Sequence, residues 1–221
     1  MELIYGNQPR GSSRLARFAD WYYLNSPMAI TARKRLRAVV AWLRARAEQM
    51  LEKKDQVKIL SLACGGASDV VLAFSEESFT GKLEFLGVDH DEAALAHARA
   101  KANVVGLSHF RFLKGNALRL QIENKCPFDL VLCLGLFDYF NDKIAAKVAN
   151  DLHGLLSPGG LFLFGMTGEN PSQKAFESRL RWHLKYRSVE QIVTFPKKTS
   201  FARSQLLTNC NGCFLLVECE K

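Results

Sequence analysis

Small, acidic and amide side chains stand directly after four short apolar runs of the sequence. Small residues in a bend let a ligand approach the backbone closely, and an acid that follows a strand can accept hydrogen bonds from both hydroxyls of a ribose. These residue types favour binding of a nucleoside. The candidates are Ala63, Cys64 and Gly65 in the first bend, Asp89 and His90 after the second run, Asn116 and Ala117 after the third, and Leu134 at the end of the fourth.

Asp89 carries the clearest expectation of these residues. It lies 24 residues beyond Gly65, at the end of an expected strand, and we expect its carboxylate to bind the ribose. Its alternative role is to cap the helix that is expected to start at Asp91.

The remaining candidates would surround the rest of the nucleoside. His90 is expected at the rim of the adenosine. The side-chain amide of Asn116 and the backbone N–H of Ala117 would read an adenine edge. Leu134 would form a small apolar floor beside the reactive group.

A second group of residues could line the pocket of the other substrate. Asp138 and Tyr139 follow the fourth apolar run and are candidate catalytic residues that line this pocket; alternatively, they pack and cap before the next helix. Tyr22 and Tyr23, beside Trp21, could form a lid, because aromatic rings with polar tips exclude water yet bind a polar ligand. Their alternative is packing of the N-terminal segment on the sheet edge.

A third group lies in residues 171–195, where we expect a helical stretch. Residues 183, 186 and 187 would then share one face, which gives substrate-binding candidates in Trp182, Tyr186 and Arg187. Arg187 could bind an acceptor carboxylate through two hydrogen bonds, and His183 is a candidate general base. Alternatively, Trp182 is a core residue and Arg187 makes a structural ion pair.

Strands that alternate with helices must position these residues. Alternation predicts a parallel sheet, and strands that are apolar throughout predict helices on both of its faces. Asn211-Gly212 predicts a hairpin, so the sheet should end in an antiparallel pair. Ser157–Gly160 is expected to be a turn. The expected strands are Val57–Ala63, Leu83–Val88, His109–Leu113, Phe128–Leu134, Leu161–Gly165, Ser200–Leu207 and Cys213–Glu218, and the expected helices are Asp69–Phe74, Asp91–Ala102 and Lys143–Leu156.

The N-terminal segment differs from the rest in charge. Up to Lys54 there are eleven Lys and Arg against four Asp and Glu, whereas the whole chain has a net charge of +8. Residues 1–26 are expected to be irregular, and Ser26-Pro27 to start a helix that runs to about Leu51. We therefore expect an N-terminal helical extension or lid over 1–55 and an α/β domain over 56–221.

The six cysteines favour neither disulfides nor a metal site. Cys64, Cys133 and Cys219 fall in or beside apolar runs, where a thiol acts as a small hydrophobic group. Cys210-Asn-Gly-Cys213 has metal-like spacing but lacks a second pair, so no metal is expected. Without a long apolar run or a signal-like N-terminus, the expected location is the cytoplasm.

The arrangement over about 56–221 resembles the Rossmann-like S-adenosylmethionine methyltransferases. A dinucleotide site would need Gly-x-Gly-x-x-Gly, which is absent. The first motif of these methyltransferases reads acidic-x-Gly-x-Gly-x-Gly, and here the matching positions are Ser61, Ala63, Gly65 and Ala67. The resemblance implies a three-layer sandwich with a mostly parallel seven-stranded sheet, and S-adenosylmethionine as cofactor with S-adenosylhomocysteine as product. The missing acid removes one indirect contact to the methionine amino group.

Several stretches are similar to one bacterial subgroup, the methyltransferases of extracellular-factor (3-hydroxy fatty acid methyl ester) biosynthesis. This resemblance implies transfer of a methyl group to a carboxylate or other oxygen of a small, partly apolar acid, and it leaves a homodimer open. The stretches are Ile59–Gly65, Leu134–Tyr139, Pro158–Gly160 with Asn170-Pro171, Trp182–Ser188, and the leader from Arg17 to Pro27.

Two other functions compete with this interpretation. The basic N-terminus could serve an RNA or DNA methyltransferase, but the sequence after the fourth strand reads Leu134-Gly-Leu-Phe-Asp138 instead of the Asn/Asp-Pro-Pro-Tyr/Phe motif of amino-directed enzymes. The departures in the first motif allow a non-catalytic S-adenosylmethionine-binding protein. Steeply salt-dependent RNA binding would favour the first alternative, and failure to bind S-adenosylmethionine would favour the second.

Overall fold

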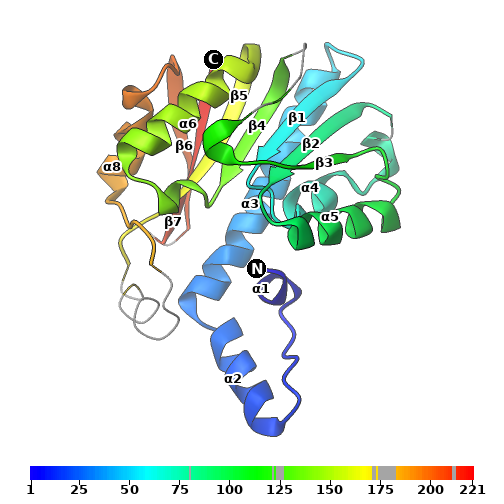
Figure 1. Ribbon diagram of the computed structural model, residues 1–221, viewed down its shortest axis with the longest axis vertical. Helices are drawn as coiled ribbons and strands as arrows, with labels where there is room; N and C mark the ends of the chain where they lie inside the picture. The colour runs from blue at the N-terminus through cyan, green and yellow to red at the C-terminus, as the bar shows by residue number, and fades with distance from the viewer. Residues whose placement is uncertain (80, 121, 123–126, 171–172, 174–182, 211–212) are drawn as a thin grey trace.

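The computed structural model of the 221-residue chain describes all residues except 80, 121, 123–126, 171–172, 174–182 and 211–212 (Figure 1). Seven strands form one sheet in the order β3-β2-β1-β4-β5-β7-β6. The first five are parallel, and β7 runs antiparallel to both β5 and β6. The strands are β1 (Val57–Leu62), β2 (Leu83–Asp89), β3 (Arg111–Lys114), β4 (Phe128–Leu134), β5 (Leu156–Thr167), β6 (Arg203–Cys210) and β7 (Phe214–Glu220).

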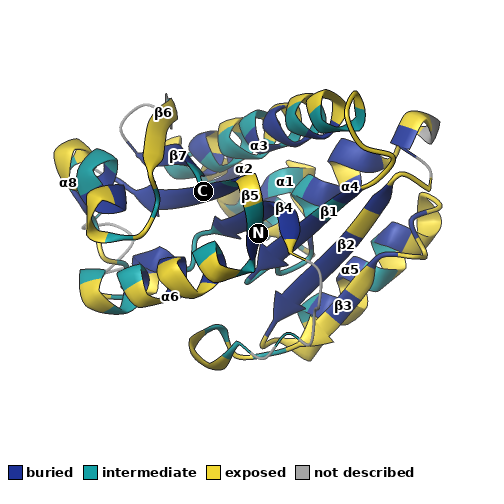
Figure 2. Cartoon of the chain, turned by 90° about the horizontal axis from the view of Figure 1, so that it is seen from above, coloured by how far each residue is buried: buried dark blue, intermediate teal, exposed yellow. Residues whose placement is uncertain are grey.

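Helices cover both faces of this sheet, so the expected three-layer Rossmann-like fold is confirmed. One face packs against α3 (Pro27–Leu51), α4 (Ser68–Phe74) and α5 (Glu92–Val104). The other packs against α6 (Asp142–Leu155) and α8 (Val189–Thr194). The central strands are buried between helices whose outer sides are exposed, whereas β3 and β6 at the two sheet edges are largely exposed (Figure 2). Short 3-10 helices span Glu77–Phe79, Ala117–Arg119, Phe137–Tyr139 and Phe195–Lys198.

Local signals set where the helices begin. Ser26 caps α3 by accepting a hydrogen bond from the N–H of Ala29, and Pro27 occupies the first turn. The side chain of Asp91 caps α5. Along α3, Val39, Trp42 and Leu43 are buried in the core, so this helix packs firmly on the sheet.

The N-terminal region contains two further helices, which corrects the expectation of an irregular segment over 1–26. These are α1 (Glu2–Gly6) and α2 (Arg14–Leu24), and α2 is capped by the side chain of Ser13. In Figure 1, α2 extends away from the sheet at the N-terminal end of α3. Among the described residues, no helix is both long and apolar enough to cross a lipid bilayer.

Two other local expectations are wrong. Residues 157–160 belong to β5, where the pairing with β4 shifts register and Gly159 adopts a φ of +71°. They are therefore an irregular strand start instead of a turn. In the stretch 171–195, residues 183–186 have no regular secondary structure and α8 covers only Val189–Thr194. The Asn211-Gly212 pair lies outside the described residues, although β6 and β7 flank it as expected.

Candidate functional site

The first candidate bend follows β1 and turns the chain into α4. Ala63, Gly65 and Ala67 all have left-handed backbone conformations, with φ values of 55°, 51° and 47°. Such conformations cost little for glycine and more for alanine, so the bend holds a defined, strained shape. A Cβ added to Gly65 would have no atom within 4 Å, which shows that this part of the bend borders open space.

Asp89 lies directly against this bend. Its Oδ2 accepts a hydrogen bond of 2.7 Å from the N–H of Gly65, and its Oδ1 accepts one of 3.0 Å from the N–H of Asp91. The residue is 7% exposed. Asp91 itself caps α5, so Asp89 is not the side chain that caps this helix. The second strand thus delivers a buried carboxylate to the turn after the first strand.

The expected adenine-reading residues lie at the next strand end. The N–H of Gly115 donates to the carbonyl oxygen of Asp89 over 2.8 Å, which joins the turn after β3 to the end of β2. Asn116 is exposed, and its side-chain oxygen accepts a hydrogen bond from the N–H of Leu118, whereas Ala117 is half-buried. The ring of His90 is 88% exposed beside Asp89. The three residues therefore lie at the ends of β2 and β3, close to Asp89, and they are not among the residues that line the cavity at the bend.

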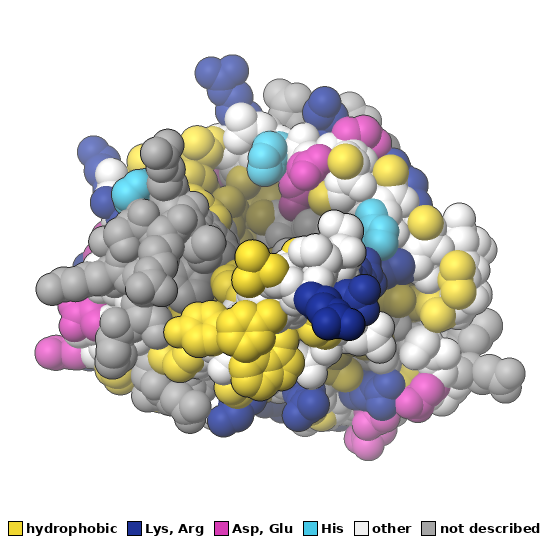
Figure 3. Space-filling view, turned by 90° about the horizontal axis from the view of Figure 1, so that it is seen from below, with side chains coloured by type: hydrophobic (Ala, Val, Ile, Leu, Met, Phe, Trp, Pro, Cys, Tyr) yellow, Lys and Arg dark blue, Asp and Glu magenta, His cyan; other side chains and the backbone are white. Residues whose placement is uncertain are grey.

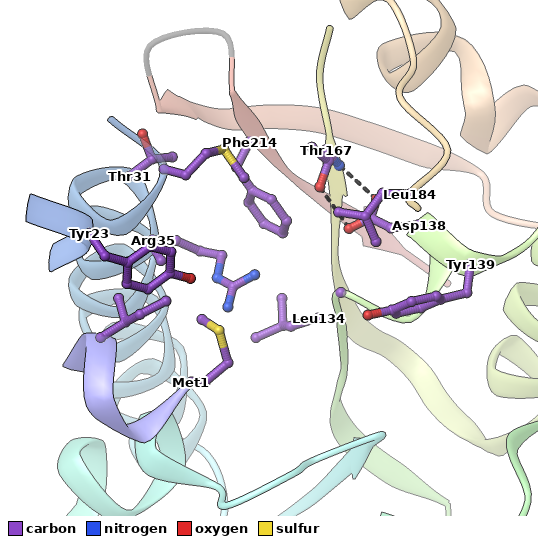
Figure 4. Close-up of a pocket in the computed structure, with 14 residues that line it drawn as sticks. Met1, Tyr23, Thr31, Arg35, Leu134, Asp138, Tyr139, Thr167, Leu184 and Phe214 are labelled. Atoms are coloured by element: carbon purple, nitrogen blue, oxygen red, sulfur yellow. Dashed lines mark hydrogen bonds between the residues drawn. The ribbon is translucent and has the colours of Figure 1, made fainter. Parts of the chain in front are cut away.

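Two cavities meet beside the bend. The first, of about 130 Å³, is lined by the bend residues from Ala63 to Asp69 together with Tyr5 and Val39. The second, of about 170 Å³, lies between α3, β4 and β7 and is shown in Figure 4. Met1, Arg35 and Leu134 line both cavities. Their shared wall makes one site with two compartments.

Arg35 is the cation at the junction of these compartments, and the sequence analysis did not single it out. Its guanidinium lies 4.5 Å from the centre of the Phe214 ring and donates to the hydroxyl of Tyr5 over 2.9 Å. Gly165 makes room for that ring, because an added Cβ would lie 2.4 Å from it. Figure 4 shows the guanidinium directed between Phe214 and Leu134 into the cavity.

Asp69 is a second residue that the sequence analysis did not select. It lies in the first turn of α4 and lines the smaller cavity together with Arg35 and Ser61. Burial raises the pKa of its carboxyl group, whereas the hydrogen bond from the N–H of Val70 and the charge of Arg35 lower it. An acid is thus present in the compartment where Ser61 replaces the acid of the first motif.

Asp138 and Tyr139 both line the larger cavity. Asp138 is 3% exposed, and its two oxygens accept hydrogen bonds from the N–H and the hydroxyl of Thr167 over 2.7 and 2.8 Å. Burial raises the pKa of the Asp138 carboxyl group. Tyr139 is half exposed, and Figure 4 shows its hydroxyl directed toward the cavity.

The expected substrate-binding face over 183–187 does not form, because this segment is not helical. Arg187 is 5% exposed, and its guanidinium donates to Asp142 over 3.0 Å and to the carbonyl oxygens of Phe137 and Phe140 over 3.1 and 2.7 Å. The expectation that Arg187 binds the acceptor is therefore corrected: its guanidinium forms a structural ion pair with Asp142, and its N–H groups donate to protein oxygens.

The neighbours of Arg187 also lie differently from the expectation. His183 is exposed, Tyr186 is half-buried, and Leu184 is the described residue of this segment that lines the larger cavity. Trp182 lies outside the described residues. The position of His183 on the surface does not support its expected role as a general base.

The aromatic residues of α2 separate onto two sides of the helix. Tyr23 lines the larger cavity, and burial raises the pKa of its hydroxyl. Tyr22 is 63% exposed and Trp21 is 53% exposed. Of the expected lid residues, the structure thus brings Tyr23 to the site and directs the other two away from the core.

Comparison with known proteins finds a match to the α/β part of the chain. Residues 59–160, which include most of β1, the bend and strands β2 to β4, match a family model described as a methyltransferase domain. Over 100% of this chain and 92% of the other, with a TM-score of 0.65 and 14% identity, the fold matches magnesium protoporphyrin IX methyltransferase from Synechocystis PCC 6803 with bound S-adenosylhomocysteine. Residues 59–160 are thus similar to a methyltransferase domain, and the whole chain shares the fold of a methyltransferase that was solved with bound S-adenosylhomocysteine. The extracellular-factor subgroup is not confirmed.

The chain has further relatives among known proteins. One is the ubiquinone biosynthesis O-methyltransferase of Leptothrix cholodnii, 27% identical over 56% of this chain and 50% of the relative. Another is the uncharacterized protein YnbC of Escherichia coli, 25% identical over 89% of this chain and 32% of the relative. The chain therefore spans between a third and a half of these relatives. A protein described as a possible exported protein of Bordetella parapertussis shares the fold, with a TM-score of 0.79 and 18% identity over 100% of this chain and 77% of the other.

Proposed function

We propose that the protein transfers a methyl group from S-adenosylmethionine to an oxygen of a small, partly apolar acid. The observation that supports this acceptor class is the 170 Å³ cavity, whose walls include Ile4, Met28, Leu134 and Phe214. These apolar walls suit the hydrocarbon part of such an acid. The O-methyltransferase relative and the resemblance to the fatty-acid methyl ester subgroup point the same way.

The smaller cavity is the proposed seat of the cofactor. The left-handed bend from Ala63 to Ala67 presents its backbone to this space, and Asp89 stands against the bend with a buried carboxylate. Each carboxylate oxygen accepts one backbone hydrogen bond and keeps further acceptor capacity, which suits the two hydroxyls of a ribose. His90, Asn116 and Ala117 would border the base at the outer side.

The amino-acid end of the cofactor is both an anion and a cation, and the smaller cavity offers one partner for each. We assign Arg35 to the carboxylate and Asp69 to the ammonium group, because both residues line this cavity. The first motif of the methyltransferases begins with an acid, and this chain has Ser61 at that position. In this arrangement Asp69 supplies the negative charge for the ammonium group instead. An incoming ammonium group would also favour the ionised form of the Asp69 carboxyl group, which burial disfavours.

The acceptor should arrive already ionised. S-adenosylmethionine supplies a methyl carbon bound to a sulfonium, which is so good a leaving group that positioning provides much of the acceleration. Both oxygens of Asp138 accept hydrogen bonds from Thr167, so Asp138 holds the strand end and Tyr139 in place and is not poised to remove a proton. A carboxylate acceptor needs no such base, which favours it over a hydroxyl.

The test is an acceptor screen with a readout of the bond that forms. The protein is incubated with S-adenosylmethionine and medium-chain 3-hydroxy acids, unsubstituted fatty acids or hydroxybenzoates, and release of S-adenosylhomocysteine is measured. Mild alkali then separates the products, because a methyl ester is hydrolysed and a methyl ether is not. We expect an alkali-labile product from the apolar acids. An alkali-stable product would show that the methyl group goes to a hydroxyl and not to a carboxylate. Turnover on RNA alone would overturn the proposal.

A further inference from the structure

The outer face of α2 is the most exposed apolar surface that the structure shows near the site. Leu15, Phe18, Trp21 and Tyr22 are 78%, 61%, 53% and 63% exposed. At 100° per residue these four positions fall on one side of the helix. Of the residues of α2, Leu24 alone is fully buried, and it lies outside the arc that these four positions span. The apolar side of this helix therefore faces away from the protein core.

Basic side chains frame this apolar face. Arg10, Arg14 and Arg17 are exposed around it. Figure 3, which views the molecule from the end where α2 lies, shows a dense apolar patch with basic side chains beside it. Between Gly6 and Ala47 the sequence holds nine Lys and Arg and one acid, Asp20. The carboxylate of Asp20 accepts hydrogen bonds from the N–H groups of Arg10 and Gly11.

We propose that this face of α2 docks on the surface of an anionic lipid bilayer. Aromatic and leucine side chains on one side of a helix, next to arginines, are the combination that places a helix in the interfacial layer of a membrane. The arginines add attraction to anionic headgroups. The α2 face is thus a site of peripheral attachment, and it is independent of the identity of the methyl acceptor.

Two other occupants fit the face less well. A second copy of the chain would bring the two sets of Arg10, Arg14 and Arg17 together, and like charges repel. A nucleic acid would need free aromatic faces for stacking on bases, whereas the rings of Phe18 and Trp21 stack on one another with centres 6.0 Å apart. Leu15, the most exposed of the four, offers a base no comparable contact.

The position of α2 links the docking face to the site. Tyr23 is adjacent in sequence to Tyr22, but it points to the other side and lines the larger cavity. A bilayer held by the outer face would lie close to the compartment that we assign to the acceptor. An apolar acid dissolved in the membrane would then have a short path to that compartment.

The experiment measures co-sedimentation of the full chain with vesicles of phosphatidylglycerol and phosphatidylcholine at 3:1, and of phosphatidylcholine alone. We expect binding to the anionic vesicles, weakening as salt rises from 0.05 to 0.5 M. Trp21→Glu should weaken the binding at least tenfold, because it puts a charge into the interfacial layer. Val104→Glu is the matched control: Val104 is 86% exposed on α5, and the variant has the same net charge. It should bind like the unaltered protein.

A second pair of variants separates the apolar and the charged parts of the attachment. Trp21→Phe should keep binding and remove the blue shift of tryptophan fluorescence on vesicles. Arg14→Gln should weaken binding about fivefold and reduce its salt dependence. Circular dichroism and the melting temperature check that each variant is folded.

Three results would overturn the proposal. The first is failure of the unaltered protein to bind anionic vesicles. The second is equal binding of Trp21→Glu and Val104→Glu. The third is that the unaltered protein does not bind vesicles but forms a dimer in analytical sedimentation, or binds RNA, and that Trp21→Glu abolishes this dimer or this RNA binding.

Discussion

The two compartments of the site are built in different ways. Half of the residues that line the smaller one are consecutive, from Ala63 to Asp69, and the carboxylate of Asp89 at the end of the neighbouring strand accepts a hydrogen bond from this bend. The larger one draws on α1, α3, β4, β5 and β7, so that Arg35 and Phe214 meet across most of the chain. A nucleoside pocket can thus be set by backbone shape and one acid, whereas an acceptor pocket depends on side chains that only the whole fold brings together.

The largest effect should come from removing Asp89, the acid that stands against the bend. Asp89→Ala should weaken binding of S-adenosylhomocysteine about a thousandfold, because two hydrogen bonds to a charged acceptor are lost at about 1.5–3 kcal/mol each. The measurement is isothermal titration calorimetry. The control is Glu92→Ala, which removes an exposed acid of α5 that pairs with Arg99. Equal affinities of Asp89→Ala and the unaltered protein would remove the ribose assignment.

A large effect on stability should follow from Arg187→Met, without an effect on cofactor binding. The variant removes the guanidinium donors to the carbonyl oxygens of Phe137 and Phe140, of which that of Phe137 still accepts from the N–H of Phe140, and we expect a loss of about 3 kcal/mol in the free energy of unfolding. Urea denaturation measures this loss. Lys198→Met, which removes the exposed partner of Asp142, should cost less than about 1 kcal/mol. A stable Arg187→Met protein with weakened acceptor binding would return Arg187 to the acceptor pocket.

The same contrast explains what the sequence could predict. The central strands were predictable because they are apolar on both faces: Phe128–Leu134 has the expected bounds, and Asp89 ends β2 as expected. The residue pattern gave a wrong prediction where hydrogen bonds to residues distant in sequence determine the backbone conformation. Residues 183–187 have helical spacing, yet the N–H of Lys185 donates to the carbonyl oxygen of Asp138 and that of Arg187 to the carbonyl oxygen of Thr167. These bonds fix an extended segment beside β5.

Other residues of the site gave too weak a local signal or none. Arg35 stands among other basic residues of α3, and only its place over Phe214 distinguishes it from them. Asp69 reads as an ordinary acid in the first turn of a helix. One local feature indicates the start of α2, the capping residue Ser13. The aromatic cluster that follows it led to the prediction of a lid in place of a helix.

A third variant tests whether Arg35 belongs to the cofactor or to the acceptor. Arg35→Gln should weaken S-adenosylhomocysteine about 10- to 100-fold, because a charge-assisted contact to the carboxylate is lost. Affinity for 5′-methylthioadenosine, which lacks the amino-acid end, should not change, whereas Asp89→Ala should weaken both ligands. A different result would assign Arg35 to the acceptor: the Arg35→Gln variant would bind S-adenosylhomocysteine normally, and only the KM of the variant for the acceptor would rise. Arg35 would then bind the carboxylate of the acceptor and not that of the cofactor.

A smaller effect is expected at the opposite charge of the same compartment. Asp69→Asn should weaken S-adenosylhomocysteine about tenfold and leave 5′-methylthioadenosine unchanged, since only the ammonium group loses its partner. The double variant Ser61→Asp/Asp69→Asn restores an acid at the position of the first motif and should recover part of the affinity. If Asp69→Asn instead weakens the binding of both S-adenosylhomocysteine and 5′-methylthioadenosine, Asp69 maintains the shape of the bend.

The smallest effect is a dependence of stability on pH at the support behind the acceptor compartment. The hydrogen bond from Lys198, joined by that from Arg187, lowers the pKa of Asp142 below its ordinary value. A lowered pKa adds stability that is complete above the ordinary value and disappears as the pH falls through the lowered one. Asp142→Asn should therefore melt below the unaltered protein at pH 6, by about 2 °C at most, and the two should converge toward pH 3. A gap that stays constant over this range would mean that packing, not charge, fixes Arg187.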